Sequence, residues 1–423
     1  MLLLLLFNTL ILPSLNADVN EPPPGPLLRQ GGQTRGLMLY PIWVLGLILL
    51  YRYHLHVVAA AWAIVALGDG MATVIGEGLA SGWRGKLAAT LPWNGWKTWA
   101  GSLGMVLCGT VGAYALMRWI APAIPADKTM MVCGAAALLG AVIESLPLAL
   151  DDNLTVPLVT AAFMFCACFM ERSALASNLP YLGRRLLLAV GVDLGFAGLA
   201  FALRAATPSG AICGFLLGTA IYLGYGYKSF LVLFAFVLMG SVATRLGFAR
   251  KAARGVAERS GGARSWREAL ANLLAPAFFA LLVITTHHEA AFLIALVAAL
   301  AEATGDTLSS EIGQLISSRA YLITTFKRVR AGENGGISLA GTAAGLAASA
   351  VIVMLGAGLK LCGPYRFAGP VIAFVAAAAG NLFDSFLGAT LERRGLVTNG
   401  LVNFAGTSVA GGLALALALR FGL

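Results

Sequence analysis

Long apolar segments, separated by short polar, Pro-bearing or Gly-bearing breaks, dominate the amino-acid sequence. Within a bilayer such segments satisfy their backbone hydrogen bonds only as helices or as a closed barrel, and their lengths are typical of transmembrane helices. The pattern predicts thirteen of them, at about 37–52, 56–80, 99–121, 129–150, 155–170, 184–205, 209–227, 228–245, 268–286, 289–308, 337–361, 368–390 and 400–420.

Composition supports the same fold class. Charged residues make up 11% of the chain, roughly half of the fraction found in soluble proteins. We therefore expect an all-α, polytopic helical membrane protein with about 13 transmembrane segments, built as two parallel-repeat halves. The net charge of +10 fits positive-inside loops better than a nucleic-acid surface. We therefore expect the protein to contact a lipid bilayer and not to bind nucleic acid.

The most informative polar stretch runs from Glu302 to Gly336. Glu302 and Asp306 share one helical face, and acids within an apolar segment normally face a protein interior or a wet cavity. A basic run containing Lys327 follows, and the glycine-rich loop 332–336 comes next, where backbone N–H groups can approach an anion. The pattern indicates phosphoryl chemistry at a membrane surface. The open alternative is a polar helix end followed by an ordinary positive-inside loop.

Four sequence anchors occur twice in the same order, at nearly equal spacing. Gly68-Asp69 corresponds to Gly305-Asp306, and the segment around Ser102 is aligned with the segment around Ser338. Glu144-Ser145 corresponds to Asp384-Ser385, and Asn153 corresponds to Asn399. This pattern predicts an internal repeat, with residues 1–35 as an N-terminal apolar segment and loop, 36–182 as one domain and 183–423 as the other.

The two halves differ at their acids. Glu302 aligns with Val65, and Glu77 of the first half aligns with Gln314. Two diverged sites indicate two related substrates. Counting spans from the Arg-rich loop 245–267 places both Asp-bearing helix ends on the cytoplasmic side of the inner membrane.

The chemistry follows from these residue types. No P-loop motif is present, but phosphoryl transfer needs chiefly metal ions and bases positioned on phosphates. Because Mg²⁺ is held by one or two carboxylates plus substrate oxygens, the candidate metal ligands are the acids of the two halves: Asp69, Glu77, Glu144, Glu302, Asp306 and Asp384. Lys97 is placed to neutralise a phosphate.

The stretch from Gly68 to Leu103 resembles the dolichol kinase and phytol kinase group of the CTP-transferase superfamily, through Gly68-Asp69-Gly70, Lys97-Thr98 and Gly101-Ser102. The stretch from Gly305 to Gly345, with Asp384-Ser385 and 397–399, resembles the family that contains plant phytyl-phosphate kinase.

The resemblance implies a membrane isoprenoid-lipid kinase with CTP as phosphate donor. The first half would phosphorylate a prenol, and the second would phosphorylate the resulting monophosphate. Asp69, Lys97, Asp306 and Asn334 are then expected to be catalytic. Substrate and nucleotide would contact Gly68, Gly70, Thr98, Ser102, Asn153, Gly305, Ser309, Ser310, Lys327, Gly335, Gly336, Ser338 and Asn399. Two other functions stay open at this point: a CDP-lipid cytidylyltransferase, which needs the same carboxylates, and a membrane transporter, for which Asp193 is the best-placed acid.

Overall fold

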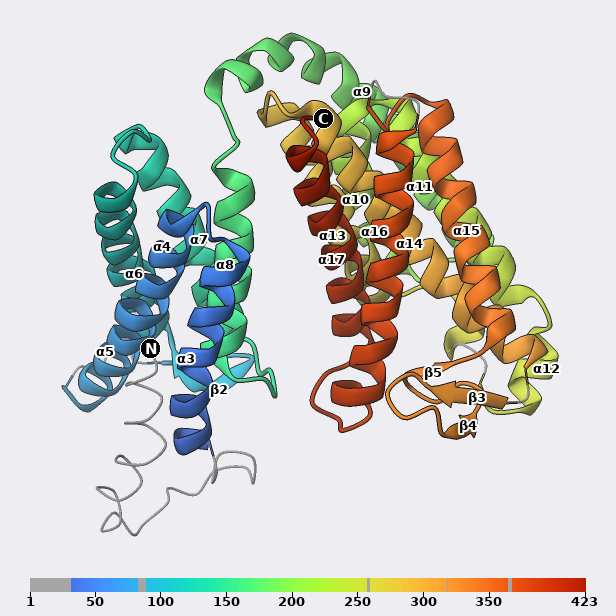
Figure 1. The fold of residues 1–423 in the computed structure, drawn as a ribbon, viewed down its shortest axis with the longest axis horizontal. Coiled ribbons are helices and arrows are strands. Elements are labelled where there is room, and N and C mark those ends of the chain that lie inside the picture. The colour runs from blue at the N-terminus through green and yellow to red at the C-terminus, as the bar shows by residue number, and fades with distance from the viewer. Residues whose placement is uncertain (1–31, 83–88, 257–258, 318, 364–366) are drawn as a thin grey trace. The chain divides into compact units, whose positions relative to one another are not determined.

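The computed structural model describes residues 32–82, 89–256, 259–317, 319–363 and 367–423. The chain divides into two compact units, residues 1–168 and 169–423 (Figure 1). The domain boundary expected at 182/183 lies inside a helix, α9 (Arg172–Ala202), which belongs to the second unit.

The first unit is organised around a helical span that contains a π-helical turn. Helix α4 (Leu55–Ala63) continues through η2 (Ile64–Asp69) into α5 (Gly70–Gly82). Helix α6 (Trp99–Ile120) packs along this span and along α7 (Ala126–Ser145). Helices α8 (Asp152–Ala167) and α3 (Gly32–Leu50) complete the unit, and α8 contacts α4 and α7.

The second unit surrounds α14 (Glu289–Ile316), whose side chains are almost all buried over its apolar length. Helices α11 (Tyr227–Arg245), α13 (Trp266–Thr285), α15 (Leu339–Gly358), α16 (Ala368–Leu387) and α17 (Asn399–Arg420) contact it. The remaining helical elements are α10 (Pro208–Tyr225), α12 (Phe248–Ala253), η4 (Arg259–Gly262) and η5 (Gly388–Glu392), which extends α16 as a second π-helical turn. Alanine and glycine on α14, α15 and α17 let these backbones approach closely, as in membrane helix bundles.

Each of the thirteen predicted apolar segments is a helix, and this confirms the fold class of a helical membrane protein. Eleven helical spans of the described residues are long and apolar enough to cross a membrane. The two others, Pro41–Leu50 within α3 and Asp152–Ala167, are shorter apolar helices.

Short strands in the polar loops were not expected from the sequence. In the first unit, β1 (Thr90–Leu91) pairs antiparallel with β2 (Asn94–Thr98). In the second unit, β3 (Arg319–Leu322) lies between β4 (Arg328–Arg330) and β5 (Gly336–Ile337), at one end of the helix bundle (Figure 1). The strands hold the basic residues of these loops in a fixed register beside the helix ends.

Candidate functional site

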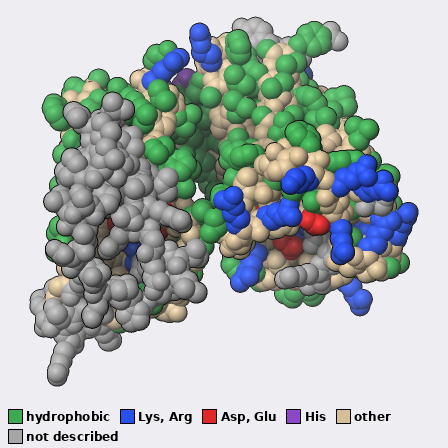
Figure 2. Space-filling view, turned by 60° about the horizontal axis from the view of Figure 1, so that its bottom comes forward, with side chains coloured by type: hydrophobic (Ala, Val, Ile, Leu, Met, Phe, Trp, Pro, Cys, Tyr) green, Lys and Arg blue, Asp and Glu red, His purple; other side chains and the backbone are tan. Residues whose placement is uncertain are grey.

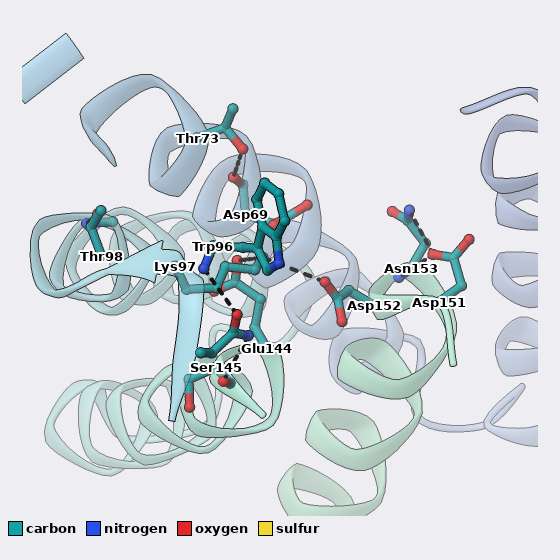
Figure 3. Close-up of polar contacts among 12 residues, drawn as sticks. Asp69, Thr73, Trp96, Lys97, Thr98, Glu144, Ser145, Asp151, Asp152 and Asn153 are labelled. Atoms are coloured by element: carbon teal, nitrogen blue, oxygen red, sulfur yellow. Dashed lines mark hydrogen bonds and ion pairs between the residues drawn. The ribbon is translucent and has the colours of Figure 1, made fainter. Parts of the chain in front are cut away.

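In the first unit, three carboxylates and one ammonium group come together from four elements: Asp69 ends η2, Lys97 lies on β2, Glu144 is near the end of α7, and Asp152 begins α8. Figure 3 shows these side chains pointing toward one another at the helix ends. The cluster brings together Asp69, Lys97 and Glu144, as the sequence predicts.

Lys97 is the centre of this cluster. Its Nζ donates to Glu144 Oε1 and, at 3.4 Å, to Asp152 Oδ2. The Glu144 carboxyl group also interacts electrostatically with that of Asp69. Glu144 is 3% exposed and Lys97 22%, so a buried acid here has its counter-ion at the edge of the bundle. Three carboxylates to one ammonium leave the cluster with an excess of negative charge.

The protonation of Lys97 follows from its neighbours. Burial alone lowers the pKa of the Lys97 ammonium, but Glu144, Asp152 and Asp69 favour the charged form and together outweigh burial. The pKa of Lys97 is therefore raised above its usual value, and the side chain is a permanent cation at neutral pH.

The β1–β2 hairpin is attached to the end of α7. Trp93 Nε1 donates to Ser145 Oγ at 3.3 Å, and Asn94 Nδ2 donates to the Ser145 carbonyl at 3.1 Å. These bonds hold the strand that carries Lys97 against the helix that carries Glu144.

In the second unit, four carboxylates converge in the same manner. Glu302 and Asp306 lie on α14, Asp384 on α16 and Glu392 at the end of η5. Asp306 interacts electrostatically with each of the other three, and Glu302 interacts with Asp384. The predicted convergence of Asp306 with Asp384 and Glu302 is therefore observed.

Glu302 occupies the most enclosed position of this acidic cluster. It is 1% exposed, and neither of its carboxylate oxygens has a hydrogen-bond partner among the described residues; the same holds for Asp384 Oδ2. Two glycines make room for it: a Cβ at Gly406 would lie 2.4 Å from Glu302 Oε1, and one at Gly380 would lie 2.9 Å from Glu302 Cγ. Unpartnered carboxylate oxygens in a buried site are the donor set that a hard cation prefers.

The glycine-rich loop reaches this acidic cluster through η5. Gly335 has φ +72°, and a Cβ there would lie 2.2 Å from the Ala389 backbone nitrogen. Its own backbone nitrogen lies 2.9 Å from where a Cβ on Gly388 would be. Arg393 pairs with Glu333 at 3.6 Å and connects η5 to the loop a second time. The loop is thus packed against the helix end, and Gly335 is a close-contact residue.

Basic side chains border the acids. Lys327, Arg328 and Arg330 are exposed on β4 and the turn before it. Figure 2 shows Lys and Arg side chains gathered around acidic side chains on one face of the second unit. An acidic centre with a basic rim is suited to a metal-bound phosphate.

Several predicted substrate contacts have structural roles. Thr98 and Ser338 are N-caps of α6 and α15. The Asn153 amide donates to Asp151 Oδ1 at the start of α8. Close helix contacts involve Gly68, Gly305 and Ser309, whereas Gly336 is part of β5. Ser102 is half-buried in α6, and the exposed members of the set are Gly70, Ser310, Lys327 and Asn399. Asn334, which was expected to be catalytic, is also exposed. Glu77 lies on α5, and its side chain is outside the described residues.

Two carboxylates of the clusters were missed as candidate ligands. Asp152 could have been identified from the sequence, because it lies beside Asn153 in the repeated motif. Glu392 had no sequence signal, because the π-helical turn η5 changes the angle at which its side chain leaves the helix.

The same pattern of close glycine contacts occurs within each of the two units. A Cβ on Gly101 would lie 2.9 Å from the Ala72 carbonyl oxygen and 3.1 Å from Thr98 Oγ1. A Cβ on Gly341 would lie 2.6 Å from the Ser309 carbonyl oxygen and 3.0 Å from Ser338 Oγ. These contacts pair Thr98, rather than Ser102, with Ser338. Each of the two residues is the N-cap of the helix that follows its loop.

A metal ion would need ligands beyond the protein. Among the described residues, no group of three or more His, Cys, Asp or Glu side chains is placed to hold a metal by itself. Mg²⁺ sites that act on phosphates commonly have one or two carboxylates and take the other oxygens from water and substrate. The donor types fit such a site, and the Mg²⁺ prediction stays a prediction.

Comparison with known proteins gives a consistent set of relatives. The model of the family described as integral membrane protein DUF92 matches residues 191–415. An uncharacterized membrane protein of Methanocaldococcus jannaschii is 35% identical over 49% of this chain and 84% of its own length. Protein VTE6, chloroplastic, of Arabidopsis thaliana is 34% identical over 52% of this chain and 63% of its own length.

A more distant relative is phytol kinase 1, chloroplastic, of Arabidopsis thaliana, which is 31% identical over 23% of this chain and 32% of its own length. No solved structure matches the chain.

Proposed function

The chain belongs to the DUF92 family of integral membrane proteins, and from that premise we propose that it is a membrane kinase of isoprenoid lipids. The observation that carries the proposal is the acidic cluster of each unit, placed at helix ends beside a basic strand or loop. Support for the substrate class comes from the relatives, since one of them is named a phytol kinase.

The proposed reaction is two successive phosphoryl transfers. In the first unit, the hydroxyl oxygen of a prenol attacks the terminal phosphorus of a nucleoside triphosphate. The bond from that phosphorus to the bridging oxygen breaks, the nucleoside diphosphate leaves, and the hydroxyl proton passes to a carboxylate, for which Asp69 is the candidate. In the second unit, an oxygen of the monophosphate is the nucleophile, and the product is a diphosphate. CTP is the proposed donor in both steps.

In this proposal the basic residues bind phosphate and the carboxylates bind Mg²⁺. Lys97, a permanent cation, would hold a phosphate in the first unit, and Lys327, Arg328 and Arg330 would do so in the second. Mg²⁺ would be held by Asp69 and Glu144 in one unit and by two of Asp306, Asp384 and Glu302 in the other, with the remaining oxygens supplied by water and phosphate. Bound there, it would neutralise the charge that develops on the transferred phosphate. The apolar helices would bind the isoprenoid chain, at about 0.8 kcal/mol per buried CH₂.

We also propose that the two units are related by an internal repeat and that both sites face the cytoplasm. The matching contacts of Gly101 and Gly341 support the first statement. The Arg-rich loop after α11 supports the second through the positive-inside rule.

The test uses purified full-length protein with labelled CTP and either free geranylgeraniol or its monophosphate. Asp69→Asn should abolish use of the alcohol and retain conversion of monophosphate to diphosphate. Asp306→Asn should accumulate monophosphate. Each change keeps the side-chain shape and removes one charge, so a rate loss on the order of 10²-fold or more is expected.

Matched controls are Asp127→Asn, at the opposite end of α7 from Glu144, and Glu171→Gln, which is exposed. Both should leave the rates unchanged. Loss of both steps in either cluster variant would mean that the two units form one shared site. Absence of any phosphoryl transfer in the unmodified protein would refute the kinase proposal.

A further inference from the structure

Two adjoining cavities lie near the first residues of α14, away from Glu302 and Asp306 of the acidic cluster. The first, of about 240 Å³, is lined by Asn178, Tyr181, Arg185, Tyr225 and Glu289 among others. The second, of about 390 Å³, shares Arg185 and Tyr225 and continues along apolar and aromatic side chains, which include Leu188 and Tyr222. A polar compartment therefore opens into an apolar one.

These cavities are separate from the acidic cluster. Glu289 begins α14, whereas Asp306 lies 17 residues further along the same helix (306 − 289). At 1.5 Å per residue the two positions are roughly 25 Å apart along the helix axis, a distance close to the thickness of the hydrocarbon core. The cavities and the acidic cluster thus belong to opposite membrane interfaces.

Within the described residues, the cations at these cavities form no ion pair with a carboxylate, although Glu289 lines the first cavity together with Arg185. Arg185 Nη1 makes one long hydrogen bond, 3.4 Å to the Leu223 carbonyl. Lys228 lies in a cation–π arrangement with its Nζ 5.5 Å from the centre of the Tyr225 ring. The nearby acid, Glu289, interacts electrostatically with Tyr225. Among the described residues, neither Arg185 nor Lys228 forms a salt bridge, so both retain capacity for an anion.

The turn that presents these groups is preformed. Helices α10 and α11 are joined by Gly226 alone, at φ +69° and ψ −149°, a conformation essentially restricted to glycine. Ser229 Oγ lies 2.7 Å from the Ile221 carbonyl and 2.9 Å from the Gly226 carbonyl and fastens the two helices across the turn. Tyr225 and Lys228 are therefore held in position before any ligand arrives.

We propose that these cavities bind an amphiphile with a phosphate headgroup, at a site distinct from the acidic cluster. Arg185 and Lys228 neutralise the phosphate, and the Arg185 guanidinium is suited to two-point contact with it. The apolar chain runs past Leu188 and Tyr222. Basic and aromatic side chains at a membrane interface are the groups that recognise anionic headgroups. A membrane phospholipid and a prenyl phosphate share this chemistry.

Binding to the purified full-length protein in neutral detergent tests the proposal. The probes are phosphatidylglycerol, geranylgeranyl monophosphate and inorganic phosphate, with phosphatidylcholine as the uncharged comparison. Arg185→Gln should weaken binding of the tightest anionic amphiphile about tenfold, since hydrogen bonds to charged groups contribute about 1.5–3 kcal/mol. Lys228→Gln should weaken it in the same direction. The amphiphile that binds more tightly identifies the source of the phosphate.

The matched control is Arg184→Gln, because Arg184 is the exposed neighbour of Arg185 and does not line either cavity. It should bind as the unmodified protein does. Asp306→Asn should also retain binding, which separates this site from the proposed kinase site. Equal affinity in Arg185→Gln, Lys228→Gln and Arg184→Gln would overturn the proposal. Binding of inorganic phosphate as tight as that of both amphiphiles would overturn the apolar part of it.

Discussion

At the scale of single residues, glycines determine where the carboxylates lie. Gly406 on α17 and Gly380 on α16 leave the space into which Glu302 extends. Val65 stands at the aligned position of the first unit, so this extra acid distinguishes the second unit. The site therefore depends on the lack of side chains at Gly406 and Gly380 as much as on Glu302 itself.

The space at Gly406 gives a sharp prediction. Gly406→Ala should displace the Glu302 carboxylate and lower the rate of the second phosphoryl transfer by on the order of 10²-fold. Gly412→Ala on the same helix is the control, because nothing lies within 4 Å of a Cβ there. Steady-state kinetics with prenyl monophosphate measures both, and equal rates in the two variants would contradict the assigned role of Glu302.

Substitution of Gly335 in the glycine-rich loop tests the stability of the fold rather than phosphate binding. The sequence alone predicts that valine at both Gly335 and Gly336 abolishes turnover and leaves folding intact, because the loop lies outside the apolar segments. The structure corrects this, because Gly335 has a positive φ and contacts Ala389. We predict that Gly335→Val lowers the unfolding temperature of the protein, whereas Asn334→Ala, at an exposed position, does not. Thermal unfolding in detergent distinguishes the two variants.

At the scale of elements, the short helix α12 is held to α14 by a buried ion pair. Lys251 Nζ lies 2.5 Å from Glu311 Oε2, and it also donates to the carbonyls of Ala243 and Thr244. Val256, just after α12, packs where a Cβ on Gly332 would be. The ion pair thus holds α12 to the end of α14. Val256, which follows α12, in turn packs against the glycine-rich loop beside the acidic cluster.

Removing one partner of this pair should be costly. Lys251→Met leaves Glu311 buried without a counter-ion, for which a loss of about 3–5 kcal/mol is typical. The double variant Lys251→Met, Glu311→Leu should recover most of that stability. Arg250→Met, on the exposed side of α12, is the control. Equilibrium unfolding in detergent measures all three, and a Lys251→Met variant as stable as Arg250→Met would show that the pair is not needed.

The sequence predicts the helices well and the strands not at all. Apolar segments of about 20 residues carry a strong signal, so α16 was expected within a few residues of its bounds and α14 from its first residue, although α14 continues to Ile316, beyond the expected end at 308. Strands of two to five residues, such as β2 and β5, are too short for periodicity to detect. The contacts of Lys97 with Glu144 and Asp152 join distant parts of the chain, and only the aligned motifs pointed to them.

At the scale of the whole molecule, about half of this chain matches a protein that is shorter than it. The relative from Methanocaldococcus jannaschii matches half of this chain but most of its own length. The family match at 191–415 lies entirely within the second unit. We predict that residues 169–423, expressed alone, insert into membranes and convert prenyl monophosphate to diphosphate. Activity of membranes that contain this fragment is the measurement, with its Asp306→Asn variant as the blank.

Each candidate site lies at a π-helical turn, η2 at Asp69 and η5 beside Asp384. Such a turn accommodates one residue more than an α-helix of the same length, so the direction of the acid depends on a surplus residue in the chain. Deleting Ala66 would leave hydropathy and span length nearly unchanged, yet it would rotate everything before it by about 100° relative to Asp69. Two homologous chains with the same spans and the same acids can therefore differ in whether those acids meet, and the length of one turn decides which.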